Sequence, residues 1–320
     1  MSVSEPITAS RSDSGWKELF DRSIAEMKAM ELPDDVQIPS LPWALTEFLQ
    51  AAADPDIEIR KLGQIIECDP GMTVDLLKCV NIATHGSAKP IRSATEALIR
   101  MGVPNARNHL MGAGLRSATL AYESRLMNHG NFWNESLRRG LFAQHAARKI
   151  NTDSDLAFVG GLLQDFVLPV LTNQFDSDYI DFMREAAPAG KNLADWERET
   201  FGWDHATTAA LMAQRWNMPD DLLCAILLHH RMDLPLKSPD KEVFHLFPVT
   251  LAALLPDQLS QVSNGVRQLV TADQRSSIFD LNELCDAVDD EVEAIAEGHE
   301  APMYLSPIVL QTRDAMLAGL

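Results

Sequence analysis

The stretch Gly160-Gly161-Leu162-Leu163-Gln164-Asp165-Phe166-Val167-Leu168 places one carboxylate inside an apolar segment with helical periodicity. An unpartnered carboxylate is costly to bury, so Asp165 needs a partner. Two further motifs lie downstream, Asp204-His205 at the start of one predicted helix and His229-His230 at the end of the next. Carboxylate and imidazole groups that converge in this way are typical of a metal-ligand pocket. The sequence therefore predicts a buried polar cluster around Asp165.

Apolar residues recur with helical spacing in nearly every periodic segment, and none shows a sustained period of two, which predicts an all-α fold. Helix-start and helix-stop signals agree with this prediction. Ser93 and Glu96 form a capping box, and Gly102 follows as a stop signal. In the second half we expect helices over residues 132–150, 154–175, 192–201, 204–216 and 219–231.

The order of these segments predicts three parts. Residues 1–32 comprise a polar tail, expected to be disordered over residues 1–14, and a first helix. Residues 33–235 form the main domain, which a loop rich in Asn, His and Gly divides into an N-terminal helical bundle (33–127) and a second subdomain (128–235). Residues 236–320 form a C-terminal helical extension.

The composition, with 46% hydrophobic and 23% charged residues in 320, is that of a globular protein. No segment reaches the roughly 18 uninterrupted apolar residues that a membrane-spanning helix needs, and the polar start lacks a signal-peptide core. We therefore expect a cytoplasmic protein that binds no membrane. The net charge of −19 also argues against a nucleic-acid partner. The arginines that lie at helical distances are expected on solvated faces, namely Arg100, Arg107, Arg116, Arg125, Arg138 and Arg139.

Motifs in both halves of the chain resemble those of the HDOD family, the HD-related output domains of bacterial signalling. The resemblance spans about residues 36–235, and its specificity comes from the number of separate motifs that agree in order and spacing. In the first half they are Ile38-Pro39-Ser40-Leu41-Pro42, Cys68-Asp69-Pro70-Gly71-Met72-Thr73 and Pro90-Ile91-Arg92-Ser93. In the second half they are Trp133-Asn134-Glu135-Ser136-Leu137, the stretch 160–165, Phe201-Gly202-Trp203-Asp204-His205 and Arg215-Trp216-Asn217-Met218-Pro219.

The resemblance implies an HD-like multi-helix bundle with an N-terminal helical subdomain. The HDOD family is a degenerate branch of the HD superfamily, whose active members hydrolyse phosphate esters with one or two metal ions. Compared with those members, this chain has Glu135 at the first histidine, Gln164 at the histidine of the His-Asp pair, Ala253 at a later aspartate and Leu168 at a lysine. The residues implied for a vestigial metal or ligand pocket are Glu135, Gln164, Asp165, His205, His229 and His230.

These departures predict that no dinuclear hydrolytic centre forms, and no catalytic residue is assigned. For Asp165 we favour a structural role without a cofactor, in which the ring of His205 or His229 satisfies the carboxylate. The alternative is a single divalent metal ion held by the surviving donors. Because neighbouring helical residues point in different directions, at most one of His229 and His230 is expected to face the pocket, while the other caps carbonyl groups.

The leading hypothesis is a non-enzymatic regulatory module that transmits a bacterial signal by binding a signalling protein partner. A residual metal-dependent phosphohydrolase acting on a phosphodiester or nucleotide is the rival hypothesis. A third is a sensor that binds a small ligand in the vestigial pocket without cleaving it. The sequence identifies neither the partner nor the input signal.

Overall fold

The computed structural model describes residues 13–27, 31–52, 54, 56–83, 90–238, 241–275, 279–295 and 304–319. Within these ranges the regular structure is helical and contains no strand, so the predicted all-α fold is confirmed. The tail predicted to be disordered lies outside the described residues, apart from its last two positions, which begin helix α1 (Asp13–Glu26).

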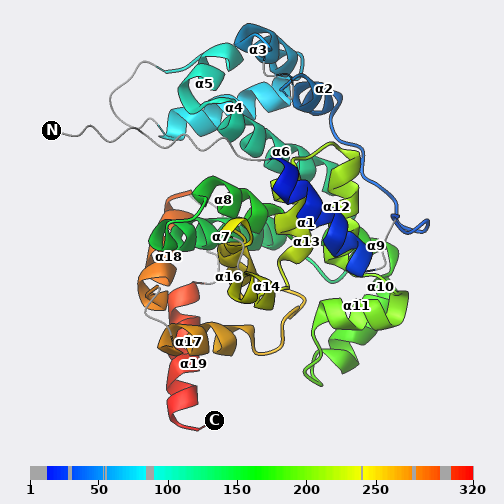
Figure 1. Cartoon of the computed structure of the whole chain (residues 1–320), viewed down its shortest axis with the longest axis vertical. Helices are drawn as coiled ribbons and strands as arrows, with labels where there is room; N and C mark the ends of the chain where they lie inside the picture. Colours follow the sequence, from blue (N-terminus) through cyan, green and yellow to red (C-terminus); the bar gives the residue numbers. More distant parts are fainter. Residues whose placement is uncertain are drawn as a thin grey trace, which may run out of the picture.

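An N-terminal helical bundle occupies the upper part of the molecule in Figure 1. Leu45, Phe48, Leu62 and Ile66 form part of its buried core. The predicted signals around α5 are confirmed, because the Ser93 hydroxyl accepts a hydrogen bond from the Glu96 backbone N–H at 3.2 Å and a left-handed glycine follows the helix. The helices are α2 (Trp43–Ala52), α3 (Ile59–Glu67), α4 (Pro70–Ala83), α5 (Ala94–Met101) and α6 (Val103–Thr119).

The second half of the chain packs around α7, the long helix labelled near the centre of Figure 1. Helix α8 lies along α7, and α13 packs against both α8 and α12. This arrangement brings the helix ends that carry the predicted pocket residues together. The elements are α7 (His129–Ile150), α8 (Ser154–Leu163), α9 (Leu168–Gln174), α10 (Asp176–Asp181), the π-helix η1 (Phe182–Ala186), α11 (Leu193–Phe201), α12 (His205–Arg215) and α13 (Asp220–Leu228).

Two glycines let α7 and α8 approach each other at backbone contact. A Cβ atom added at Gly161 would lie 2.7 Å from the Arg139 carbonyl oxygen and 3.1 Å from the Gly140 Cα. A Cβ atom added at Gly140 would lie 2.9 Å from the Phe158 carbonyl oxygen. Any side chain at either position would force the two helices apart. This contact therefore fixes the distance between Arg139 on α7 and Asp165, which follows α8.

The single helix predicted over residues 154–175 is wrong, because the helix ends at Leu163 and restarts at Leu168. In the intervening turn, the Leu168 backbone N–H donates to the Asp165 carbonyl oxygen at 2.9 Å. Pro169 then stands in the first turn of α9, where its missing N–H is tolerated. Asp165 thus lies in a turn between two helices rather than on a helical face.

The stretch Ser154–Gln174 is the segment of the described residues that is long and apolar enough to cross a membrane by composition. In this structure 83% of its apolar window is buried inside the protein. It therefore has the character of a core segment.

The segments on either side of the main domain pack onto its second half. Helix α1 lies on α13, where the Cys224 thiol donates to the Trp16 carbonyl oxygen at 3.3 Å. Helices α16 and α18 pack on α7, and α19 extends downward in Figure 1 beside α17. The C-terminal elements are α14 (Asp233–Lys237), α15 (Lys241–Phe244), α16 (Phe247–Ala252), α17 (Gly265–Arg275), α18 (Leu281–Ile295) and α19 (Leu305–Leu317).

We predict that Gly161→Ala destabilises the protein by about 1–3 kcal/mol, because the added methyl group collides with backbone atoms of α7 that cannot move independently. The matched control is Gly130→Ala in the first turn of α7, where the nearest atom to the new Cβ is the side-chain oxygen of Asn128. Urea unfolding measures both changes. Equal stability of the two variants would show that the helices are not in tight contact.

Candidate functional site

Asp165 is buried at 1% exposure, and its two carboxylate oxygens have different surroundings. Oδ2 accepts hydrogen bonds from Arg139 Nη1 at 2.6 Å, Gln164 Nε2 at 3.1 Å and Gln261 Nε2 at 3.3 Å. Burial alone would raise the pKa of Asp165, but the Arg139 guanidinium and the two nearest imidazoles outweigh it and hold the pKa well below its usual value. Asp165 is therefore an ionised carboxylate in the protein interior.

Arg139 corrects one prediction, because it was expected on a solvated face and is 2% exposed. Its neighbour Arg138 is also buried, at 4% exposure. Arg139 bridges two carboxylates, since Nη1 binds Asp165 and Nη2 donates to Asp257 Oδ2 at 2.9 Å. The main partner of Asp165 is thus a guanidinium, which was not among the predicted partners. This ion pair forms because α7 presents Arg139 one turn after Glu135, facing the end of α8.

The other oxygen of Asp165 faces imidazoles. Oδ1 lies 3.5 Å from His205 Nε2 and 3.4 Å from His229 Nε2, beyond the usual hydrogen-bond range of about 2.7–3.2 Å. His205 Nε2 lies 2.9 Å from His230 Nε2. One donor atom from each of Asp165, His205, His229 and His230 lies within 4.8 Å of the other three. The structure therefore brings together four of the six predicted pocket residues, from a turn, the start of α12 and the end of α13.

The expectation that only one of the two adjacent histidines faces the pocket is wrong. Helix α13 ends at Leu228, and both histidines that follow it contribute a ring nitrogen to the cluster. His229 also performs the predicted capping role, because its Nδ1 lies 2.6 Å from the Ile226 carbonyl oxygen. The ring of His230 lies with its centroid 4.0 Å from that of His229 and is half-buried.

Behind His205 lies a pair of residues that sequence reasoning missed. Glu197 on α11 is fully buried, and its Oε2 lies 2.5 Å from His205 Nδ1 and accepts from the His205 backbone N–H at 2.8 Å. Its Oε1 accepts from the Tyr179 hydroxyl at 2.6 Å. Burial alone would lower the pKa of His205, but Glu197 and Asp165 raise it to about 10. The surroundings of His205 therefore favour a positive charge at this position.

The remaining predicted residues lie at the edge of the cluster. Glu135 is next to Asp257, and its Oε2 accepts from the Gln258 backbone N–H at 3.4 Å. Burial and the Asp257 carboxylate raise the pKa of Glu135 to about 7. Gln164 donates to Asp165 through its amide nitrogen, and its Oε1 has no hydrogen-bond partner. Neither residue contributes a donor to the group of four.

The four donors fit one metal ion. His229 Nδ1 faces a carbonyl oxygen and His205 Nδ1 faces a carboxylate, so each Nδ1 carries a proton. His229 Nε2 then presents a lone pair, and His205 Nε2 presents one when a bound ion replaces its proton. Asp165 Oδ1 and His229 Nε2 are both buried without a hydrogen-bond partner. Two such acceptor atoms that lie 3.4 Å apart without a donor between them are costly unless a cation joins them. Three imidazole nitrogens and one carboxylate oxygen suit a transition-metal ion such as zinc, iron or manganese.

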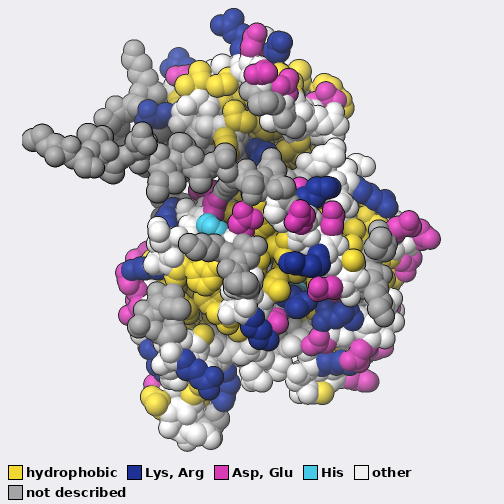
Figure 2. Space-filling model, in the orientation of Figure 1, with side chains coloured by type: hydrophobic (Ala, Val, Ile, Leu, Met, Phe, Trp, Pro, Cys, Tyr) yellow, Lys and Arg dark blue, Asp and Glu magenta, His cyan; other side chains and the backbone are white. Residues whose placement is uncertain are grey.

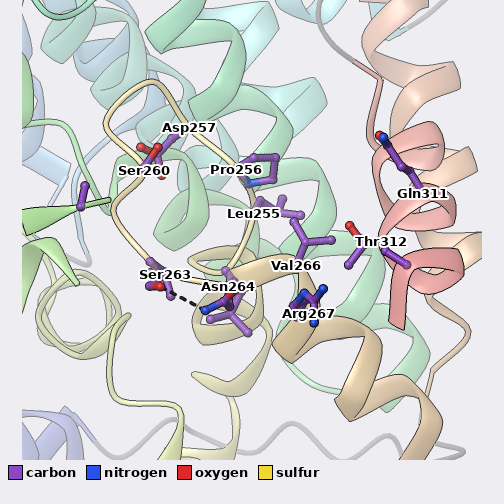
Figure 3. A pocket seen from close by; sticks show the side chains of 15 residues that line it. Leu255, Pro256, Asp257, Ser260, Ser263, Asn264, Val266, Arg267, Gln311 and Thr312 are labelled. Carbon is purple, nitrogen blue, oxygen red and sulfur yellow. Dashed lines mark hydrogen bonds between the residues drawn. The ribbon is translucent and has the colours of Figure 1, made fainter. Parts of the chain in front are cut away.

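A separate cavity of about 550 Å³ lies between α19 and the loop that leads into α17 (Figure 3). Its walls carry hydroxyl and amide side chains, including Ser260, Ser263, Asn264, Gln311 and Thr312. Asp257 lines this cavity and also binds Arg139. None of the four converging donors lines the cavity, so it lies beside the histidine cluster rather than around it.

We predict that Asp165→Ala costs about 3–5 kcal/mol, because it leaves the Arg139 guanidinium in the core without its closest counter-charge. The control is Asp233→Ala, which removes ion pairs to Arg231 and Lys237 that are about half exposed and should cost less than about 1 kcal/mol. Chemical denaturation with a chelator present measures both variants free of bound metal. A cost for Asp165→Ala no larger than the control would refute the role of the ion pair.

Comparisons with known proteins agree with this geometry. A curated relative, an uncharacterised protein of Treponema pallidum (strain Nichols), is 30% identical over 199 residues. The match covers 61% of this chain and 38% of that protein, so the chain spans well under half of the relative's length.

Three crystal structures share the fold at low identity. An HDOD domain protein of unknown function from Geobacter sulfurreducens is 17% identical, with a TM-score of 0.59 and coverage of 94% of this chain and 96% of its own. A candidate phosphohydrolase from Shewanella amazonensis SB2B is 18% identical, with a TM-score of 0.57 and coverage of 86% and 93%. A candidate signal transduction protein from Marinobacter aquaeolei VT8 is 17% identical, with a TM-score of 0.53 and coverage of 96% and 65%.

The family model described as "HDOD domain" matches residues 38–232, which is more than half of the chain. This range contains all six predicted pocket residues. Together with the all-α fold, the match shows that the chain belongs to the HDOD domain family.

Proposed function

We propose that this protein is a signal-transduction module that acts by binding a protein partner, and that its histidine cluster holds one divalent ion without hydrolysing a phosphate ester. The observation that carries the proposal is the position of Arg139. Its guanidinium occupies Oδ2 of Asp165, while the imidazoles face Oδ1. One oxygen of the Asp165 carboxylate therefore binds the Arg139 guanidinium, and the other oxygen is left for an ion held together with the imidazoles.

A dinuclear site needs a second metal ion close to the first, on the other oxygen of Asp165. That oxygen, Oδ2, already binds the positively charged Arg139 guanidinium at 2.6 Å. A metal ion bound to Oδ2 would have to displace the guanidinium from Asp165, and Arg139 is held in place from its other side by Asp257. The replacement of two histidines by Glu135 and Gln164 removes further imidazole donors. The two changes together support a site for one ion.

The residues that would hold the ion are Asp165, His205, His229 and His230. When bound there, a divalent ion polarises any ligand in an open coordination position and neutralises the converging carboxylate. We assign the ion a structural role, because its ligands would join the turn after α8 to the start of α12 and the end of α13. The sequence favoured a cluster without metal, and the unpartnered Asp165 Oδ1 and His229 Nε2 favour the single-ion alternative.

Exposed apolar side chains on the N-terminal bundle support the binding of a protein partner. Trp43 is 65% exposed and Ile99 is 67% exposed, and Ile59 and Val74 are also exposed. Figure 2 shows hydrophobic side chains gathered on this bundle. Apolar groups of this size on a protein surface are typical of interfaces. The relationship to a candidate signal transduction protein from Marinobacter aquaeolei supports the same class of function.

We predict that the full-length protein, purified without chelator, contains one equivalent of zinc, iron or manganese and hydrolyses neither phosphodiesters nor nucleotides. Asp165→Asn should lose the ion, because the neutral amide is a much weaker ligand than the carboxylate. Elemental analysis and product chromatography measure the two properties. Two ions per chain, or turnover that Asp165→Asn abolishes, would instead establish the residual phosphohydrolase.

We predict that a partner captured from the native cell by the tagged protein is lost in the Trp43→Glu, Ile99→Glu variant, because a charge on each exposed apolar side chain opposes burial in an interface. The control is Leu317→Glu, which changes an equally exposed apolar residue on α19 at the other end of the molecule. Quantitative mass spectrometry compares the three samples. A partner retained by the double variant would exclude the N-terminal bundle as the binding surface.

A further inference from the structure

Glu197 is a fully buried carboxylate on α11 that lies outside the group of four converging donors. Both of its oxygens have defined partners. Oε1 accepts from the Tyr179 hydroxyl, and Oε2 receives the backbone N–H and faces the ring Nδ1 of His205. A buried carboxylate needs hydrogen-bond partners for both oxygens, so these contacts alone could be structural. The contact of Glu197 with the ring of His205, however, points to a role in the histidine cluster.

We propose that Glu197, held in place by Tyr179, is the positioning residue that makes His205 a stronger ligand of the single ion than His229. This inference rests on the proposed single-ion site. It assigns no contact between Glu197 and the ion. Glu197 acts through the His205 ring.

The geometry explains how one carboxylate can orient the ring. His205 is the first residue of α12, directly after the N-cap Asp204, so its backbone N–H has no partner within the helix. Glu197 Oε2 binds this N–H at 2.8 Å and the ring Nδ1 at 2.5 Å. Two contacts from one oxygen fix both the backbone and the side-chain torsions of His205. Nε2 then points toward Asp165 Oδ1 and His230 Nε2.

The acceptor at Nδ1 distinguishes His205 from His229. His229 donates from Nδ1 to the neutral carbonyl oxygen of Ile226, whereas His205 donates to a carboxylate. A charged acceptor withdraws the Nδ1 proton more strongly and makes the opposite nitrogen a better electron-pair donor. His205 should therefore bind the ion more strongly than His229.

The charge of the buried groups is consistent with a divalent ion. Arg139 is the cation that binds both Asp165 and Asp257. His205 lies between Asp165 and the third carboxylate, Glu197. With neutral imidazoles, three carboxylates and one guanidinium leave two negative charges uncompensated. One divalent ion balances these charges without a further buried arginine or lysine.

Tyr179 completes the arrangement because it keeps Glu197 from rotating away. Its ring is fully buried and packs edge-on against Trp196, with centroids 5.6 Å apart. Burial, followed by the Glu197 carboxylate, raises the pKa of Tyr179 well above its usual value, so the hydroxyl stays a donor. The hydrogen bond to Glu197 Oε1 therefore persists across the pH range in which the protein is handled.

The experiment titrates the metal-free, full-length protein with Co²⁺ and follows the visible absorption of the bound ion. We expect Glu197→Gln, which keeps the shape and removes the charge, to weaken Co²⁺ binding by about 10- to 100-fold and to shift the absorption bands. Tyr179→Phe should weaken binding by a smaller factor. In the double variant, the effect of Tyr179→Phe should disappear, because it acts through Glu197.

The control is Thr172→Val, which removes another fully buried hydroxyl whose hydrogen bond, to the Leu168 carbonyl oxygen, does not lead to the cluster. It should lower the stability of the metal-free protein and leave Co²⁺ affinity and spectrum unchanged. If Glu197→Gln does not fold, Tyr179→Phe alone tests the inference by the same two readouts. Wild-type protein that binds one Co²⁺ while the variants bind it equally well overturns the positioning role, whereas wild-type protein that binds none overturns the single-ion site itself.

Discussion

The ion pair between Arg139 and Asp165 is the interaction on which the centre of this structure depends. It places two full charges in the protein interior, where each is the closest counter-charge of the other at 2.6 Å. The pair can form because α7 and α8 touch at Gly140 and Gly161, which brings the guanidinium to the turn where the carboxylate lies. The position of Asp165 then determines which of its oxygens is left for the histidines.

The fold was largely predictable because helix boundaries depend on local chemistry. The Ser93 capping box and the glycine at 102 act within a few residues, and both occur in the structure as expected. The break between α8 and α9 was missed because the apolar periodicity continues through it, and only the turn bonds around Asp165 and Pro169 reveal it. The sequence pattern shows which residues are apolar but not where a buried helix is interrupted.

The candidate site was predictable for the residues that the family resemblance covers. Asp165, His205, His229 and His230 converge, although the sequence predicted that His229 and His230 would point in different directions. Arg139 was missed because an arginine next to another arginine on a long helix has the pattern of a solvated face. Its proximity to Glu135, one turn earlier, and to a predicted buried acid was the signal that could have identified it. Tyr179 and Glu197 carry no local signal, since only the tertiary fold places them behind His205.

The contact between Gly140 and Gly161 has a consequence for the effects of substitutions in this protein. The side chains of Glu135 and Gln164 lie at the edge of the histidine cluster and outside this contact. The glycine pair lies within the contact, and a single methyl group there would separate the helices that carry the opposite charges. A substitution at Glu135 or Gln164 would therefore change the chemistry around the cluster, whereas a substitution at either glycine would change the helix crossing that holds the cluster together.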